Sequence, residues 1–246
     1  MESDPSYLLV DAGNTRIKWA LHDGRAFVAS GAVATAQAAA LGEPWARLPE
    51  LGGVVASNVA GPEVAASLEH ACAGSGAPLR FIRSEAEQLG VVNGYREPQQ
   101  LGPDRWAALI AAHRGDRGHK LVVSVGTALT IDALAEGGRF LGGLIVPGPA
   151  LMRSSLDRGT AGLRLTEGKF SDFPASTPDA ITSGAIQACV GAMARMRDAM
   201  AAQGMEPSRI VLCGGAAAEL EPHLPLPAKL RENLVLDGLA LIAREA

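Results

Sequence analysis

The chain has few cysteines, few aromatic residues and no long hydrophobic run. Its 246 residues include only Cys72, Cys189 and Cys213, which are odd in number and far apart, so no disulfide framework is expected. No stretch of 18 or more apolar residues occurs, and a shorter run is not typical of a membrane span. The polar, acidic start of the sequence does not fit a signal peptide. These features predict a reduced, cytoplasmic, soluble protein with no membrane anchor.

The chain also has no excess of basic over acidic residues. The formal net charge is -4, whereas proteins that bind nucleic acid use clustered Lys and Arg against the phosphate backbone. Nucleic acid is therefore not expected as a partner. Apolar residues make up 48% and charged residues 20% of the chain, which is typical of a globular α/β protein.

Two short segments, Leu9–Lys18 and Val122–Asp132, carry the clearest functional signal. Each reads as an apolar strand, a tight turn with Gly and Thr, and a second strand. Superposing the two segments places Gly13 on Gly126. Backbone N–H groups in such turns form a concavity that binds anions. The recurrence therefore predicts two lobes that face one polyphosphate, and with it phosphoryl transfer.

The strand pattern restarts near residue 116, which predicts an N-terminal lobe over residues 1–115 and a C-terminal lobe over 116–246. In the first lobe the pattern predicts a meander of three strands followed by helices near 62–73 and 103–114. In the second lobe it predicts three more strands, a helix at 149–157, a long helix at 178–202 and a last helix at 234–244.

Asp11 lies between an apolar strand and a glycine turn. Such a carboxylate can hold Mg²⁺ through water, because Mg²⁺ keeps part of its hydration shell and shares phosphate oxygens. Asn14, Thr15 and Lys18 would then line the phosphates. The alternative is a hairpin in which the aspartate caps its own turn. The second turn at Gly126-Thr127 favours the phosphate site.

Asp104 begins a helical stretch next to Arg105. It is a candidate general base for a substrate hydroxyl, with Arg105 binding an anionic end of the same substrate. Taken alone, the position favours a helix N-cap, which is the commonest role of Asp at a helix start. The two roles are compatible. Tyr95, in a polar loop before Pro98, is a candidate substrate contact.

Two weaker signals lie in the second half. Asp132 follows Thr130 by two residues and so shares a strand face with it, which suits a phosphate or Mg²⁺ site and equally a surface aspartate. The pair Gly214-Gly215 suits close approach to a flat base such as adenine and equally a plain turn. The histidines show no metal-ligand spacing.

Five segments taken in order resemble the type III pantothenate kinase family, also known as the Bvg accessory factor family. They are Asp11–Lys18, Tyr95–Ala107, Gly126–Asp132, Gly142–Gly148 and Ser176–Gly184. The resemblance implies an α/β fold with two ribonuclease-H-like lobes of the actin, hexokinase and Hsp70 kinase superfamily. It also implies phosphorylation of pantothenate to 4'-phosphopantothenate, the first step of coenzyme A biosynthesis.

The same resemblance implies a role for individual residues. ATP would be bound by the two turns, through Asp11, Ala12, Gly13, Asn14, Thr15, Arg16, Ile17, Lys18 and Thr127. Pantothenate would be held by Tyr95, Gly102, Pro103, Asp104 and Arg105, and by Thr177 across a homodimer interface. Asp104 would accept the proton, and Mg²⁺ would accompany the ATP.

Ser124 is the one departure from the family pattern, which usually has an aspartate there that holds K⁺ or NH₄⁺. A hydroxyl is a neutral and weaker ligand, so the monovalent-cation dependence of this chain is in question. Ser124 also favours an alternative function, a regulatory or accessory protein that binds nucleotide with weakened kinase activity. The acidic balance and the intact Asp104 oppose it. A kinase for another hydroxy acid or a sugar is a third reading, which the Tyr95–Arg105 block disfavours.

Overall fold

The computed structural model describes residues 5–115, 117–160, 162–163 and 166–245. It divides into two compact units. The first unit is Met1–Gly115 together with Asn233–Ala246, and the second unit is Asp116–Glu232. The predicted boundary near residue 116 matches the first passage of the chain between the units. The last segment differs from the prediction, because it lies in the first unit and not in the second.

The first unit is built on a five-stranded sheet with the order β3-β2-β1-β4-β5. Its strands are β1 (Tyr7–Ala12), β2 (Arg16–His22), β3 (Phe27–Ala34), β4 (Gly53–Asn58) and β5 (Leu79–Phe81). Strands β1 to β3 form an antiparallel meander, and β4 and β5 run parallel to β1. The remaining elements are η1 (Thr35–Leu41), α1 (Gly42–Trp45), α2 (Pro62–Ala73), β6 (Glu87–Gln88), β7 (Val91–Val92), η2 (Pro98–Gln100), α3 (Pro103–Gly115) and α7 (Leu234–Ala243).

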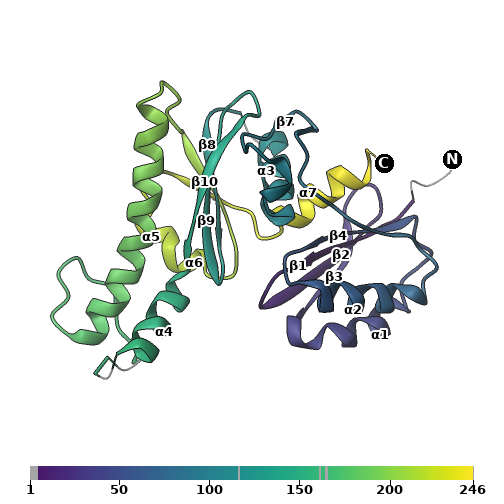
Figure 1. Ribbon diagram of the computed structural model, residues 1–246, viewed down its shortest axis with the longest axis horizontal. Coiled ribbons are helices and arrows are strands. Elements are labelled where there is room, and N and C mark those ends of the chain that lie inside the picture. Colours follow the sequence, from purple (N-terminus) through teal and green to yellow (C-terminus); the bar gives the residue numbers. More distant parts are fainter. Residues whose placement is uncertain (1–4, 116, 161, 164–165, 246) are drawn as a thin grey trace. The chain divides into compact units, whose positions relative to one another are not determined.

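Alternate residues of the central strand β1 face opposite sides of this sheet. Val10 and Ala12 lie in a core with residues of α1 and α2, which cover one face, whereas α3 and α7 lie on the other (Figure 1). The backbones of α3 and α7 lie in close contact, since a Cβ on Gly238 of α7 would lie 2.0 Å from the carbonyl oxygen of Ala107 of α3. The apolar helix α7 thus completes the first unit, which is why the chain returns to it.

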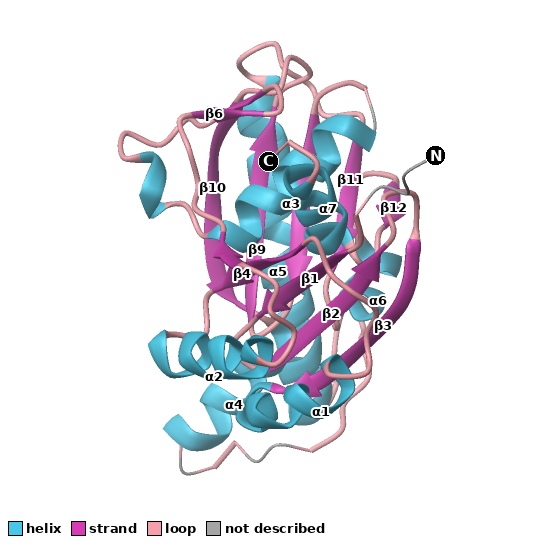
Figure 2. Ribbon diagram, turned by 90° about the vertical axis from the view of Figure 1, so that its right-hand side faces the viewer, coloured by secondary structure: helices cyan, strands magenta, loops and turns pink. Residues whose placement is uncertain are grey.

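The second unit repeats this design. Its strands are β8 (Lys120–Val125), β9 (Ala128–Leu134), β10 (Phe140–Pro147), β11 (Arg209–Cys213) and β12 (Ala228–Leu230), in the order β10-β9-β8-β11-β12. Its helices are α4 (Pro149–Gly159), α5 (Thr177–Ala201), α6 (Ala217–Leu220) and η3 (Glu221–His223). Residues of α5, α6 and one sheet face share a core. The strand order of both sheets is the same, as the repeated sequence pattern predicts. Figure 2 distinguishes the strands and helices by colour.

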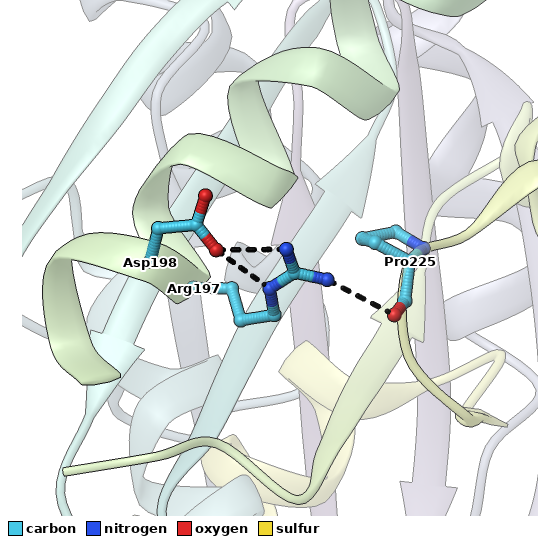
Figure 3. Close-up of polar contacts among 3 residues, drawn as sticks. All are labelled: Arg197, Asp198 and Pro225. Atoms are coloured by element: carbon cyan, nitrogen blue, oxygen red, sulfur yellow. Dashed lines mark hydrogen bonds and ion pairs between the residues drawn. The ribbon is translucent and has the colours of Figure 1, made fainter. Parts of the chain in front are cut away.

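Arg197 connects the long helix α5 to the segment that leads into β12 (Figure 3). Its Nη1 donates to the carbonyl oxygen of Pro225 at 3.5 Å, and its Nε and Nη2 donate to Oδ1 of Asp198 at 2.9 and 2.7 Å. The ion pair between Arg197 and Asp198 is partly exposed and joins two neighbouring residues of α5, so it contributes only about 0–1 kcal/mol to the free energy of unfolding. The buried apolar core therefore holds α5 to the sheet.

Across the described residues, none of the helices has the length and apolar character needed to cross a membrane.

Candidate active site

The turn between β1 and β2 is short and closed. Ala12 pairs with Ile17, and the N–H of Gly13 donates to the carbonyl oxygen of Arg16 at 3.1 Å. Ala12 and Ile17 are fully buried in the core, so their side chains anchor the turn and only their backbone is left for a ligand. Asn14, Thr15 and Arg16 are exposed. The predicted phosphate turn is thus a short hydrogen-bonded loop with exposed polar residues at its tip.

Lys18, Asp11 and Ser57 form a row across three strands of the first sheet. Asp11 pairs with Lys18 of β2 and with Ser57 of β4. Residues paired in this way point to the same face of a sheet. That face is the one covered by α3 and α7, because Val10 and Ala12 occupy the opposite core. The structure therefore brings the two charged residues predicted from the first motif side by side.

Asp104 lies close enough to this row to interact with it electrostatically. Burial first, and the negative charge of Asp104 second, raise the pKa of Asp11 to about 7, while Lys18 acts in the opposite direction. Burial also raises the pKa of Asp104, against the lowering effects of the Arg105 N–H and guanidinium. Two carboxyl groups that repel each other in this way favour a cation between them.

The start of α3 fixes the Asp104 carboxylate. The first helical bond runs from the N–H of Trp106 to the carbonyl oxygen of Gly102 at 3.0 Å, so Gly102 precedes the helix and Asp104 lies in its first turn. The sequence-based N-cap alternative for Asp104 is therefore wrong by two residues. A Cβ on Gly102 would lie 2.6 Å from Asp104 Oδ1, which explains the glycine. Ser84 Oγ donates to the carbonyl oxygen of Leu101 at 2.7 Å and steadies this approach.

Tyr95 and Arg105 are brought together, as the substrate block predicts. Arg105 Nη1 donates to Tyr95 Oη at 3.2 Å, and the guanidinium carbon lies 5.8 Å from the centre of the Tyr95 ring. Asn93 organises the loop: its Oδ1 accepts from the N–H of Tyr95 at 3.0 Å, and its Nδ2 donates to the carbonyl oxygens of Glu85 and Pro98, both at 3.2 Å. Sequence reasoning missed this role of Asn93, although an Asn-Gly pair is a common turn signal.

A cavity of about 410 Å³ opens in the first unit next to the start of α3. Its lining residues are Asn58, Phe81, Ile82, Arg83, Ser84, Gln99, Leu101 and Pro103. The volume is within the range of small-molecule sites, roughly 300–1,000 Å³. Pro103, the residue before the candidate base, is part of this lining, whereas Asp104 is not.

Ser57 is a further polar residue of the site that no sequence motif identified. Its side chain is 0% exposed, and within the described part of the chain its Oγ has no hydrogen-bond partner. Buried hydroxyls normally have a partner. Its position beside Asp11 could be found only from the pairing of β1 with β4, which the sequence does not reveal.

The turn of the second unit is one residue shorter than that of the first. Val125 pairs with Leu129, and the N–H of Gly126 donates to the carbonyl oxygen of Ala128 at 3.0 Å. Thr127 is exposed at its tip. The first turn spans residues 13–16 and this one 126–128, so both predicted turns exist with slightly different shapes.

Ser124 occupies the place in the second sheet that Asp11 occupies in the first. It pairs with Thr130 of β9 and Cys213 of β11, so the row Thr130–Ser124–Cys213 repeats the row Lys18–Asp11–Ser57 without charges. Asp132 shares this face by alternation and is 2% exposed. The alternative of a surface aspartate at that position is therefore wrong.

The second unit contains two other residues that the sequence analysis singled out, Gly214 and Thr177. A Cβ on Gly214 would lie 2.3 Å from the carbonyl oxygen of Val125, so close strand packing is sufficient to explain this glycine. Thr177 is the exposed first residue of α5. The helix start is held by Asp179, whose N–H donates to Ser176 Oγ at 3.3 Å and whose Oδ1 accepts from the N–H of Lys169 at 2.7 Å.

Comparison with solved structures defines the class of fold. A Sinorhizobium meliloti protein described as a 2-dehydro-3-deoxygalactonokinase matches with a TM-score of 0.64 at 16% identity, covering 97% of this chain and 98% of that one. A Campylobacter jejuni protein described as a Baf family transcriptional activator matches with a TM-score of 0.62 at 20% identity, covering 97% and 98%. The chain has a mixed α/β fold with a five-stranded sheet of the same strand order in each unit, and its structural neighbours include kinases of the actin, hexokinase and Hsp70 superfamily type.

Sequence comparison then gives the family. The family model for type III pantothenate kinase matches residues 7–199. The type III pantothenate kinase of Aromatoleum aromaticum is 48% identical over 238 residues, covering 97% of this chain and 98% of the relative. That of Nitrosospira multiformis is 46% identical over 242 residues, covering 98% and 92%. The chain belongs to the type III pantothenate kinase family, which confirms the resemblance seen in its motifs.

Proposed function

We propose that this chain transfers the γ-phosphoryl group of ATP to the primary hydroxyl of pantothenate, the first step of coenzyme A biosynthesis. Membership of the family supports the substrates. The observation that carries the chemistry is the pairing of Lys18 with Asp11 on one sheet face, with Asp104 of α3 close enough for its charge to raise the pKa of Asp11.

Asp104 is the general base of the proposed reaction. The pantothenate oxygen forms a bond to the γ-phosphorus while the bond from that phosphorus to the β,γ-bridging oxygen breaks, so ADP leaves. The hydroxyl proton passes to the Asp104 carboxylate. Burial raises the pKa of Asp104, and a base whose pKa is nearer to the working pH removes a proton more effectively.

The two turns and Lys18 bind the phosphates of ATP in this proposal. Their backbone N–H groups and the Lys18 ammonium offset the charge of the triphosphate, which is the main requirement of phosphoryl transfer. The repelling pair of Asp11 and Asp104 fits a divalent cation, since carboxylate oxygens are the ligands that Mg²⁺ prefers. Asp11 would hold Mg²⁺ through water, and the ion would supply further neutralisation of the phosphates.

Tyr95, Gly102, Pro103 and Arg105 hold pantothenate in the same proposal, beside the cavity that Pro103 lines. Arg105 faces the pantothenate carboxylate, since its guanidinium is fixed by Tyr95. Thr177 belongs to the second unit, and the family resemblance supports its contact with pantothenate across a homodimer interface. The three cysteines are buried free thiols, which is typical of a reducing compartment and supports action in the cytoplasm.

The test is an assay of pantothenate phosphorylation with ATP, comparing the wild type with Asp104→Asn. We expect Asp104→Asn to lower kcat by about 10²–10⁴-fold, because the base is lost, with the thermal unfolding midpoint preserved. Glu63→Gln, an exposed first-turn acid of α2 on the opposite face, is the matched control and should keep full activity. Near-normal turnover in Asp104→Asn would remove Asp104 from this role. A wild type that binds ATP and phosphorylates nothing would support the regulatory alternative.

A further inference from the structure

In each unit, the residue that follows the third strand contacts the phosphate turn. The N–H of Thr35, directly after β3, donates to the carbonyl oxygen of Thr15 at 3.0 Å. The N–H of Gly148, directly after β10, donates to the carbonyl oxygen of Thr127 at 2.8 Å. The two turns are thus closed by the same backbone bond at corresponding places in the repeat.

Thr35 makes a second bond that Gly148 cannot make. Its Oγ1 donates to the carbonyl oxygen of Gly13 at 2.7 Å. At Gly148 a Cβ would lie 2.0 Å from the carbonyl oxygen of Gly126, so the shorter second turn leaves no room for a side chain. The first turn is therefore fixed at two carbonyls by one residue, and the second at one carbonyl by backbone alone.

Fixing these carbonyls also fixes N–H groups. In a trans peptide the C=O and the following N–H point in opposite directions within one plane. Because the Gly13 carbonyl points to Thr35, the N–H of Asn14 points away from it. The same relation holds between the Thr15 carbonyl and the N–H of Arg16. Thr35 thus sets the direction of two backbone donors in the turn that would bind phosphate.

We infer that Thr35 is a positioning residue for the first phosphate turn, which orients the N–H groups of Asn14 and Arg16 toward the nucleotide. It touches none of the reacting atoms and acts through the turn. The inference rests on the proposed function, because it takes the first turn as the place where ATP phosphates bind.

The test compares Thr35→Val, which keeps the shape and loses the hydroxyl, with Thr35→Ser, which keeps the hydroxyl. Affinity for ADP is measured by calorimetry without pantothenate, and KM for each substrate is measured by the kinase assay. One hydrogen bond to a carbonyl predicts that Thr35→Val weakens ADP binding and raises KM for ATP by about 2- to 10-fold. KM for pantothenate should stay unchanged, and Thr35→Ser should restore the nucleotide values.

Thr160→Val is the matched control, since Thr160 Oγ1 donates to the carbonyl oxygen of Leu156 at 2.8 Å in the second unit and should leave ADP affinity unchanged. Wild-type ADP affinity in folded Thr35→Val would overturn the inference. If that variant does not fold, ADP binding that is as weak in folded Thr35→Ser as in a hydroxyl-free Thr35→Ala would overturn it as well. A wild type that binds ADP but fails to phosphorylate pantothenate would refute the proposed function. The comparison of ADP affinities among the Thr35 variants could still be interpreted in that case.

Discussion

At the scale of single residues, the ionisation of Asp11 depends on groups far from it in sequence. Burial and the charge of Asp104 raise its pKa to about 7, so this carboxyl titrates near neutral pH and not near the usual value of about 3.9. The motif around Asp11 predicted a ligand for phosphate-bound Mg²⁺. It did not predict the shifted pKa, because Asp104 approaches only through the packing of α3 on the sheet.

This pKa predicts a pH-dependent stability. The folded chain binds the Asp11 proton up to about pH 7, whereas the unfolded chain releases it near pH 3.9. The stability that this proton confers is present below the unfolded pKa and is lost as the pH rises through about 7. We therefore expect the free energy of unfolding of Asp11→Asn to rise progressively relative to that of the wild type as the pH increases from about 3.9 to about 7. Above about pH 7 the difference should be constant.

Urea unfolding of both proteins across this pH range, in the presence of EDTA, measures the difference. Asp104→Asn serves as the companion variant, since removing its charge should move the Asp11 transition to lower pH. A difference between Asp11→Asn and the wild type that does not change with pH would contradict the assignment.

The proximity of site residues was predictable where one local motif carries them. Asp104, Arg105 and Tyr95 stand in one short block, and the structure brings Tyr95 and Arg105 together. Ser57 was not predictable, because its only relation to the site is its pairing with Asp11 across β1 and β4.

At the scale of elements, the two hairpins show what a repeated pattern can and cannot predict. The recurrence of strand, Gly-Thr turn and strand predicted both turns, and the sheets share one strand order. β12 (Ala228–Leu230) escaped prediction, because a three-residue strand is defined by its pairing with β11 and not by its own composition. The one-residue difference between the turns likewise depends on the register of the strands.

The neutral row in the second sheet leads to a prediction about monovalent cations. Ser124 takes the place of Asp11 between Thr130 and Cys213, and a hydroxyl attracts K⁺ less than a carboxylate does. We expect the wild-type rate to respond weakly to K⁺ and Ser124→Asp to gain a several-fold activation.

Initial rates are measured against KCl, with choline chloride keeping the ionic strength constant. Ser124→Asn, which adds similar bulk without charge, should behave like the wild type. Equal responses of Ser124→Asp and Ser124→Asn to K⁺ would refute the prediction.

At the scale of the whole molecule, sequence order and spatial grouping differ. The pattern predicted a second lobe that reaches residue 246, yet α7 belongs to the first unit. Its composition is apolar enough for any core, so only tertiary packing decides which sheet it covers. Gly238 is central to that decision, because it lets α7 approach α3 backbone to backbone.

Replacing this glycine should weaken the first unit. A Cβ at Gly238→Ala would lie 2.0 Å from the Ala107 carbonyl oxygen, and overpacking of this kind costs about 1–3 kcal/mol in free energy of unfolding. Gly191→Ala in α5, where a Cβ meets nothing within 4 Å, is the matched control and should stabilise by about 0.5–1 kcal/mol. Chemical denaturation measures both, and equal effects of the two substitutions would contradict the proposed α3–α7 contact.

The return of the chain to its first unit also orders events during synthesis on the ribosome. Every residue of the second unit precedes α7 in the chain, so the core of the first unit is completed only after the whole second unit has been translated. A chain that stopped before α7 would therefore carry Asp11 on a sheet that lacks one of its covering helices.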